Sequence, residues 1–212
     1  TVNPHDDPDH PPDHPKGPQA RRNPADPDHR RLVEWGDFHH SRRHCKGGRD
    51  RMCFAARGFG QVQAGESGAP ATEPLQTADG TPVTVAELAK GKGVVVNFWA
   101  TWCAPCIKEM PQLDVLKANL AGHGIPVIAV SQDRGGLAQV EPFFAKHGYQ
   151  NLAIHLDPKG AFARANKVRG LPTTILYDAE GREKGRIEGV AEWDVPEIEA
   201  FIRACLRPPN GG

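Results

Sequence analysis

Two cysteines separated by two residues are the part of this sequence best suited to chemistry. Cys103 and Cys106 enclose an Ala-Pro pair and follow directly on a run of β-branched and aromatic residues over 94–99. After the pair, apolar residues recur with a helical period. The pattern therefore predicts a buried strand that turns into a helix, with both thiols at the turn. They would lie about one helical turn apart, close enough to form a small disulfide ring.

The position of these thiols at the start of a helix gives them distinct roles. A thiol attacks a disulfide only as its thiolate, and the unpaired N–H groups and dipole of a helix N-terminus stabilise that anion. Cys103 is predicted to lie where these groups point, so it would attack a partner's disulfide. Cys106 would then resolve the mixed disulfide. Pro105 fits the first helical turn, where a missing N–H costs nothing.

A carboxylate on the same helix could handle the protons of this exchange. Glu109 is three residues after Cys106 and is predicted to face the same side of the helix. A partly buried carboxylate there could accept or donate the proton of Cys106. The alternative is an ordinary surface acid in the first turns of the helix.

Other uses of a Cys-x-x-Cys pair have less support from the sequence. A zinc site needs two more ligands, and Cys45 and Cys53 lie in a segment without predicted structure. Haem attachment needs His directly after the second cysteine, whereas Ile107 stands there. Two buried structural cysteines would not fit a turn near the surface. Redox chemistry is therefore favoured, with zinc as the open alternative.

Alternating strands and helices over residues 69–207 indicate an α/β domain with parallel strands in the middle and an antiparallel hairpin at the end. An Asp-Gly turn indicates a first hairpin over 75–83, and Thr84 can cap a short helix at 85–89. The other predicted strands are 94–99, 125–131, 152–156, 173–177 and 183–190, the last at the edge of the sheet. The other predicted helices run from Cys103 to about 120 with a kink at Pro111, and over 137–147, 157–168 and 195–206.

Residues 1–68 differ in composition from the rest of the chain. Pro alternates there with Asp, His and Arg, and the few large apolar residues have no period. Such a segment cannot bury enough surface to offset its ordering entropy, so we predict a disordered arm, and a frayed tail at 208–212. The arm begins with Thr1 and contains no apolar signal-peptide core. It is either a genuine arm or a region translated upstream of the true start.

The bulk composition excludes several classes of function. The chain has 212 residues and a formal net charge of +0, which does not favour a nucleic-acid partner. No apolar run approaches the roughly 20 residues of a membrane span. Its five cysteines, an odd number, do not form the framework of a small secreted scaffold. We expect a monomer without metal or cofactor, apart from a redox-active disulfide.

Two motifs together resemble the thioredoxin superfamily. One is Val-Asn-Phe-Trp-Ala-Thr-Trp-Cys-Ala-Pro-Cys at 96–106, followed by Glu-Met-Pro from Glu109; the other is Gly-Leu-Pro-Thr-Thr at 170–174. The likeness covers about residues 70–206. It is greatest to the extracytoplasmic TlpA/ResA-like reductases, which include cytochrome c maturation proteins. It implies a thioredoxin fold, a central mixed sheet flanked by helices, with an N-terminal hairpin and a central insert.

The resemblance also implies roles for individual residues. A cis peptide bond at Leu171–Pro172 would pack against the disulfide and help to dock the substrate strand. Asn97 stands where thioredoxin proper keeps a buried acid, and TlpA/ResA-like proteins place their acid at the position of Glu109. From its place beside the active turn, Trp102 is expected to shield the disulfide and form the docking surface, with a role in packing only as the alternative.

The expected activity is therefore thiol–disulfide exchange in the reducing direction. The resemblance implies a periplasmic or other extracytoplasmic location, a membrane thiol relay as reductant, and clients such as apocytochrome c or copper-site cysteines. Two alternatives remain. One is a disulfide-introducing oxidase, which only a reduction potential distinguishes. The other is a non-enzymatic Cu(I) carrier that uses Cys103 and Cys106, because soft thiolates select that ion.

Overall fold

The computed structural model describes residues 62–64 and 69–206, so the predictions for 1–61, 65–68 and 208–212 lie outside the described residues. The strands are β1 (Val62–Ala64), β2 (Leu75–Thr77), β3 (Pro82–Val83), β4 (Val94–Trp99), β5 (Val127–Ser131), β6 (Ile154–Leu156), β7 (Thr173–Tyr177) and β8 (Glu183–Glu188). The helices are α1 (Val85–Ala89), α2 (Ala104–Ala121), α3 (Leu137–His147), α4 (Ala161–Ala165) and α5 (Pro196–Cys205).

All eight strands belong to one mixed sheet, in the order β1-β8-β7-β4-β5-β6-β2-β3. β4, β5 and β6 are parallel, whereas β7 and β8 run antiparallel to their neighbours. The prediction of parallel strands in the middle and an antiparallel hairpin at the end is thus confirmed. So is the first hairpin, in which β2 pairs with β3.

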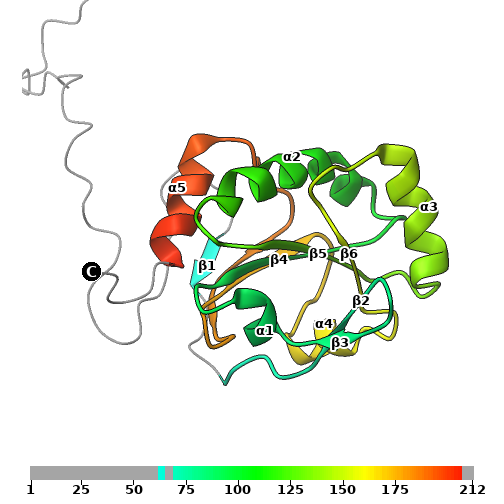
Figure 1. The fold of residues 1–212 in the computed structure, drawn as a ribbon, viewed down its shortest axis with the longest axis horizontal. Helices are drawn as coiled ribbons and strands as arrows, with labels where there is room; N and C mark the ends of the chain where they lie inside the picture. The colour runs from blue at the N-terminus through cyan, green and yellow to red at the C-terminus, as the bar shows by residue number, and fades with distance from the viewer. Residues whose placement is uncertain (1–61, 65–68, 207–212) are drawn as a thin grey trace, which may run out of the picture. The chain divides into compact units, whose positions relative to one another are not determined.

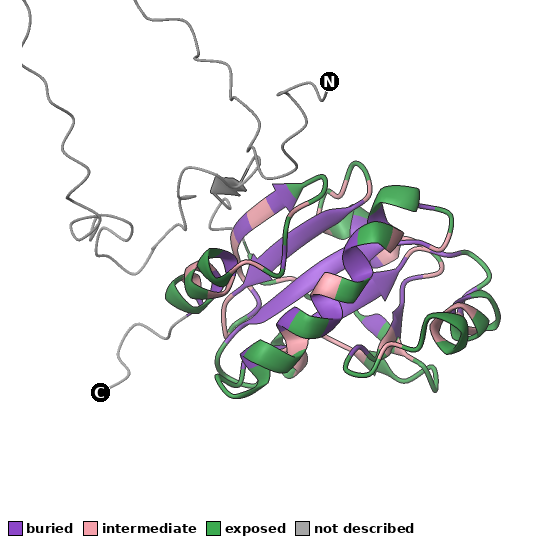
Figure 2. Cartoon of the chain, turned by 90° about the horizontal axis from the view of Figure 1, so that it is seen from above, coloured by how far each residue is buried: buried purple, intermediate pink, exposed green. Residues whose placement is uncertain are grey.

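Helices cover both faces of this sheet (Figure 1): α2, α3 and α5 lie on one face, and α1 and α4 on the other. β4 is buried along its whole length because both of its faces are covered. Its side chains alternate between two apolar clusters. Val95 and Trp99 pack with the residues of α2 and α5, while Val96 and Phe98 pack with those of α1 and α4. Figure 2 shows these buried strands between the more exposed helices.

Local signals account for the start of several helices. Thr84 caps α1 in a capping box with Glu87, whose carboxylate accepts from the backbone N–H of Thr84 at 2.7 Å. α2 begins after Cys103 and continues as one helix through Pro111. Among the described residues, no helix combines the length and the apolar character needed to cross a membrane.

Two predictions are wrong, one about the length of a helix and one about the place of a strand in the sheet. The helix expected over 157–168 is reduced to α4, because Asp157 accepts from the backbone N–H groups of Phe162 and Ala163 and Lys167 adopts a left-handed φ of 55° after the helix. β8 is also not at the edge of the sheet, since β1 pairs with it. β1 lies within the segment predicted to be disordered.

Candidate active site

Cys103 and Cys106 lie at the start of α2, as their spacing predicts. They are joined by a disulfide with an S–S distance of 2.06 Å. Cys103 is the N-cap of the helix, and its Sγ accepts from the backbone N–H of Cys106 at 3.3 Å. Cys103 retains 5% of its exposure, whereas Cys106 is fully buried. Pro105 occupies the first turn. Of the two cysteines, Cys103 therefore has a backbone donor to its sulfur and keeps a small exposure.

A buried carboxylate holds the turn that leads into this disulfide. Asp133 accepts from the backbone N–H of Thr101 at 2.9 Å and from its hydroxyl at 2.7 Å. It also accepts from the Ser131 hydroxyl and from Gln139 Nε2, each at 2.7 Å. Asp133 was not among the predicted site residues. A signal was available, because polar residues at the carboxyl ends of neighbouring parallel strands, here β4 and β5, meet at one edge of the sheet.

Glu109 lies in the interior behind the disulfide and is only 3% exposed. Its Oε1 accepts from Asn97 Nδ2 at 2.9 Å. Its Oε2 accepts from Trp193 Nε1 at 3.1 Å and from the backbone N–H of Ala191 at 3.3 Å. Burial raises the pKa of Glu109, while these three hydrogen bonds act in the opposite direction. The alternative of a surface acid is thereby excluded.

Asn97 connects this carboxylate to the strand that follows the proline. Its Nδ2 also donates to Thr174 Oγ1 at 2.9 Å, on the neighbouring strand β7. Its Oδ1 is buried and has no hydrogen-bond partner among the described residues. A free acceptor thus stays beside Glu109.

The Leu171–Pro172 peptide bond is cis, as the resemblance implied. The carbonyl of Pro172 accepts from the backbone N–H of Gly189 at 2.9 Å, which ties the proline to the segment after β8. A hollow of about 270 Å³ is lined by residues 169–173 together with Glu188 and Gly189. Leu171 is partly buried, and Trp102 on the turn before the disulfide is 68% exposed. Both are thus accessible to a docking partner.

Trp193 is a second residue that sequence reasoning missed. It lies between β8 and α5, is 1% exposed, and reaches Glu109 across a sequence separation of 84 residues. A single tryptophan before a helix carries no local signal for a contact of this kind. Its role became visible only in the folded chain.

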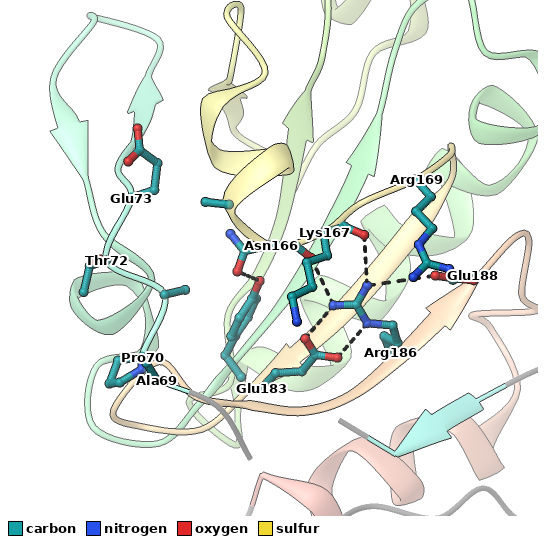
Figure 3. A pocket seen from close by; sticks show the side chains of 13 residues that line it. Ala69, Pro70, Thr72, Glu73, Asn166, Lys167, Arg169, Glu183, Arg186 and Glu188 are labelled. Atoms are coloured by element: carbon teal, nitrogen blue, oxygen red, sulfur yellow. Dashed lines mark hydrogen bonds and ion pairs between the residues drawn. The ribbon is translucent and has the colours of Figure 1, made fainter. Parts of the chain in front are cut away.

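A larger cavity of about 660 Å³ contains charged groups that pair with one another (Figure 3). Arg186 donates to both carboxylate oxygens of Glu183, at 2.7 and 2.6 Å, and to the carbonyl of Asn166 at 3.0 Å. Among the described residues, no group of three His, Cys, Asp or Glu side chains is arranged to hold a metal ion.

Comparison with known proteins defines the family. Residues 63–202 match the Redoxin family, and the chain belongs to it. The thiol-disulfide oxidoreductase ResA of Bacillus thuringiensis subsp. konkukian is 33% identical over 114 residues, which are 54% of this chain and 64% of that protein. ResA of Halalkalibacterium halodurans is 34% identical over 130 residues, 61% of this chain and 72% of that protein. The chain thus spans less than two thirds of the first of these relatives.

Solved structures agree with this assignment. A protein of Chlorobium tepidum described as a thiol:disulfide interchange protein DsbE is 29% identical, with a TM-score of 0.58 over 67% of this chain and 99% of its own. The pneumococcal exposed lipoprotein thioredoxin Etrx1 of Streptococcus pneumoniae is 27% identical, with a TM-score of 0.54 over 62% and 97%. The predicted thioredoxin fold is therefore confirmed.

Proposed function

We propose that this protein is a thiol–disulfide oxidoreductase that reduces disulfides of client proteins through Cys103 and Cys106. The observation that carries the proposal is the disulfide at the N-terminus of α2, in which Cys103 keeps a small exposure and Cys106 is fully buried. The family and the names of the ResA relatives support the same chemistry. No cofactor is required, because the sulfur pair itself carries two electrons.

The exchange proceeds in two displacement steps. In the reduced protein, the Cys103 thiolate attacks one sulfur of the client disulfide, forms a mixed disulfide and releases the other client sulfur as a thiolate. Cys106 then loses its proton, attacks the sulfur of Cys103 and releases the second client thiolate. The Cys103–Cys106 disulfide is restored, and the client has gained two electrons. Cys103 gives its proton to solvent when its thiolate forms, Cys106 gives its proton to Glu109, and the two client thiolates take up protons from solvent, to which Glu109 finally returns its own.

Glu109 is the proton acceptor for the second step. Cys106 is fully buried, so water does not reach its sulfur freely. Glu109 follows it on the same helix and is itself buried, which favours uptake of a proton. The free Oδ1 of Asn97 offers a hydrogen-bond acceptor beside Glu109.

The client strand docks between Trp102 on one side and Leu171 and Pro172 on the other. Trp102 supplies exposed apolar surface beside the disulfide, and the hollow next to Pro172 supplies space for an extended chain. The protein acts outside the cytoplasm as a monomer, with a membrane thiol relay as its reductant. Its clients are apocytochrome c haem-binding motifs or copper-site cysteines. These statements extend the TlpA/ResA-like resemblance.

Reduction of a model protein disulfide tests the proposal. Dithiol-reduced protein should reduce insulin disulfides, and Cys103→Ser should abolish this activity. Cys106→Ser should instead accumulate a mixed disulfide on Cys103, detectable by mass spectrometry, whereas Val115→Ala on the exposed face of α2 serves as a matched control. An unchanged rate in the Cys103 variant would sink the assignment. A reduction potential near the oxidising extreme would favour the oxidase instead.

A further inference from the structure

Trp193 contacts the carboxylate of Glu109 with the only polar group of its side chain. The indole Nε1 donates to Glu109 Oε2 at 3.1 Å, and both residues are almost fully buried. The same oxygen accepts from the backbone N–H of Ala191 at 3.3 Å. A short segment after β8 thus supplies both donors to one oxygen of the carboxylate.

The position of the indole is fixed from two sides. The backbone N–H of Trp193 donates to Gln112 Oε1 at 3.3 Å, so the segment is tied to α2 close to Glu109 itself. The ring packs in the apolar cluster that contains Met110 of α2 and Ile198 of α5. The indole N–H is therefore held in place before any proton transfer takes place.

The surroundings of Glu109 leave hydrogen bonds as the main means of favouring its charged form. On the elements that contact it, the nearest charged residues in sequence are exposed to solvent: Lys108, Glu192 and Asp194. Asp114, further along α2, accepts from the backbone N–H groups of residues 150–152. When the pair is reduced, Cys106 is the buried titratable residue that lies one turn before Glu109 on α2. Among the three bonds that oppose the effect of burial on the pKa of Glu109, that from Trp193 is the largest.

The segment that carries Trp193 also lines the hollow beside Pro172, where the client strand is proposed to dock. Gly189 lines the hollow beside Pro172, and its backbone N–H donates to the carbonyl of Pro172 at 2.9 Å. Four residues later, Trp193 reaches Glu109. One short segment therefore connects the surface that receives the client with the group that receives the proton.

We propose that Trp193 is a positioning residue, whose indole N–H stabilises the carboxylate form of Glu109 so that it can take the proton of Cys106. The inference rests on the proposed function, in which Glu109 receives that proton. A hydrogen bond to a charged group contributes about 1.5–3 kcal/mol. By the conversion of about 1.4 kcal/mol per factor of ten, its loss should lower the acid ionisation constant of Glu109 about ten- to a hundredfold.

Trp193→Phe tests this, with Trp99→Phe as a matched control. Trp99 is also a fully buried tryptophan of the same apolar cluster, but its Nε1 has no hydrogen-bond partner among the described residues. In the full-length reduced protein, carboxyl NMR should show Glu109 ionising at higher pH in the Trp193 variant and unchanged in the Trp99 variant. Equal shifts in both variants, or none in either, would overturn the proposal.

The pH dependence of the resolving step provides a second measurement, which a purely structural role of Trp193 would leave unchanged. The pH dependence of the resolving step should shift upward in Trp193→Phe. In a Glu109→Gln background the same substitution should leave the pH dependence unchanged, whereas a shift of the same size there would contradict the proposal. If the protein proves inactive toward disulfides, the NMR titration still decides whether Trp193 controls Glu109, so the two failures are distinguishable.

Folding of the variant is controlled separately. If Trp193→Phe does not fold, benzothienylalanine at position 193 retains the shape of the indole and replaces its N–H by sulfur. The same upward shift of the Glu109 titration is expected with this residue. Titration as in the unmodified protein would overturn the proposal.

Discussion

Replacement of Asp133 should loosen the turn that presents the disulfide. Asp133 accepts four hydrogen bonds, two of them from Thr101, two residues before Cys103. Asp133→Ala removes all four acceptor contacts. Asp133→Asn is the matched variant, because it keeps the shape of the side chain and one carbonyl oxygen and removes the charge.

The expected loss of stability depends on how many of the four donors to Asp133 water can reach in the Ala variant. Gln139 is exposed and the Thr101 hydroxyl is partly exposed, so water can replace Asp133 at both. The Ser131 hydroxyl is fully buried, and the backbone N–H of Thr101 is partly buried. Each unsatisfied buried group costs about 1–3 kcal/mol, so Asp133→Ala should lower the free energy of unfolding by about 2–6 kcal/mol. In Asp133→Asn, the Thr101 hydroxyl and the Gln139 amide can turn to accept, which limits the loss to about 1–2 kcal/mol.

Urea unfolding of the oxidised protein measures these differences. The midpoints should fall in the order wild type, Asn variant, Ala variant, with unchanged slopes. The rate of insulin reduction should fall in the same order, because the turn before Cys103 becomes less well placed. If the Ala variant is as stable as the Asn variant, the hydrogen bonds to Asp133 do not hold this turn as argued.

Two further predictions concern the stability of the fold, one at a buried histidine and one at a glycine before β4. His155 is buried and its pKa is lowered, mainly because burial disfavours its charged form. The stability that neutral His155 contributes is present above its unfolded pKa of about 6.5 and is lost as the pH falls below that value. His155→Asn should therefore flatten the decline in unfolding free energy between about pH 7.5 and 5.5. Parallel plots of unfolding free energy against pH for the variant and the wild type would contradict this. Gly93 has a φ of +133°, and a Cβ there would lie 2.8 Å from the carbonyl oxygen of Tyr177, so Gly93→Ala should lower thermal stability by about 1–3 kcal/mol. A Cβ at Gly122 would have no heavy atom within 4 Å, so Gly122→Ala should leave thermal stability unchanged. An equal loss of stability in both variants would refute the steric explanation.

Most of the fold was predictable because its signals are local. Apolar periodicity, the Asp-Gly turn and the Thr84 cap each act over a few residues, and they gave the first hairpin, the central strands and most helices. Only one of the two errors arose from a residue distant in sequence. β1 covers β8 although it lies in a Gly-rich part of the segment predicted to be disordered. α4 is shortened locally, by the carboxylate of Asp157 and the left-handed φ of Lys167.

The sequence by itself determined the chemistry of the cysteine pair. The three-residue separation of Cys103 and Cys106, and the strand-to-helix switch around them, follow from covalent spacing and helical geometry alone. Tertiary structure decided what surrounds the pair. Glu109 is buried beneath Trp193 only because the segment before α5 packs onto α2, and Asp133 meets the active turn only because β5 lies beside β4. Such hydrogen bonds join residues 32 to 84 positions apart, and no short-range pattern in the chain specifies their partners.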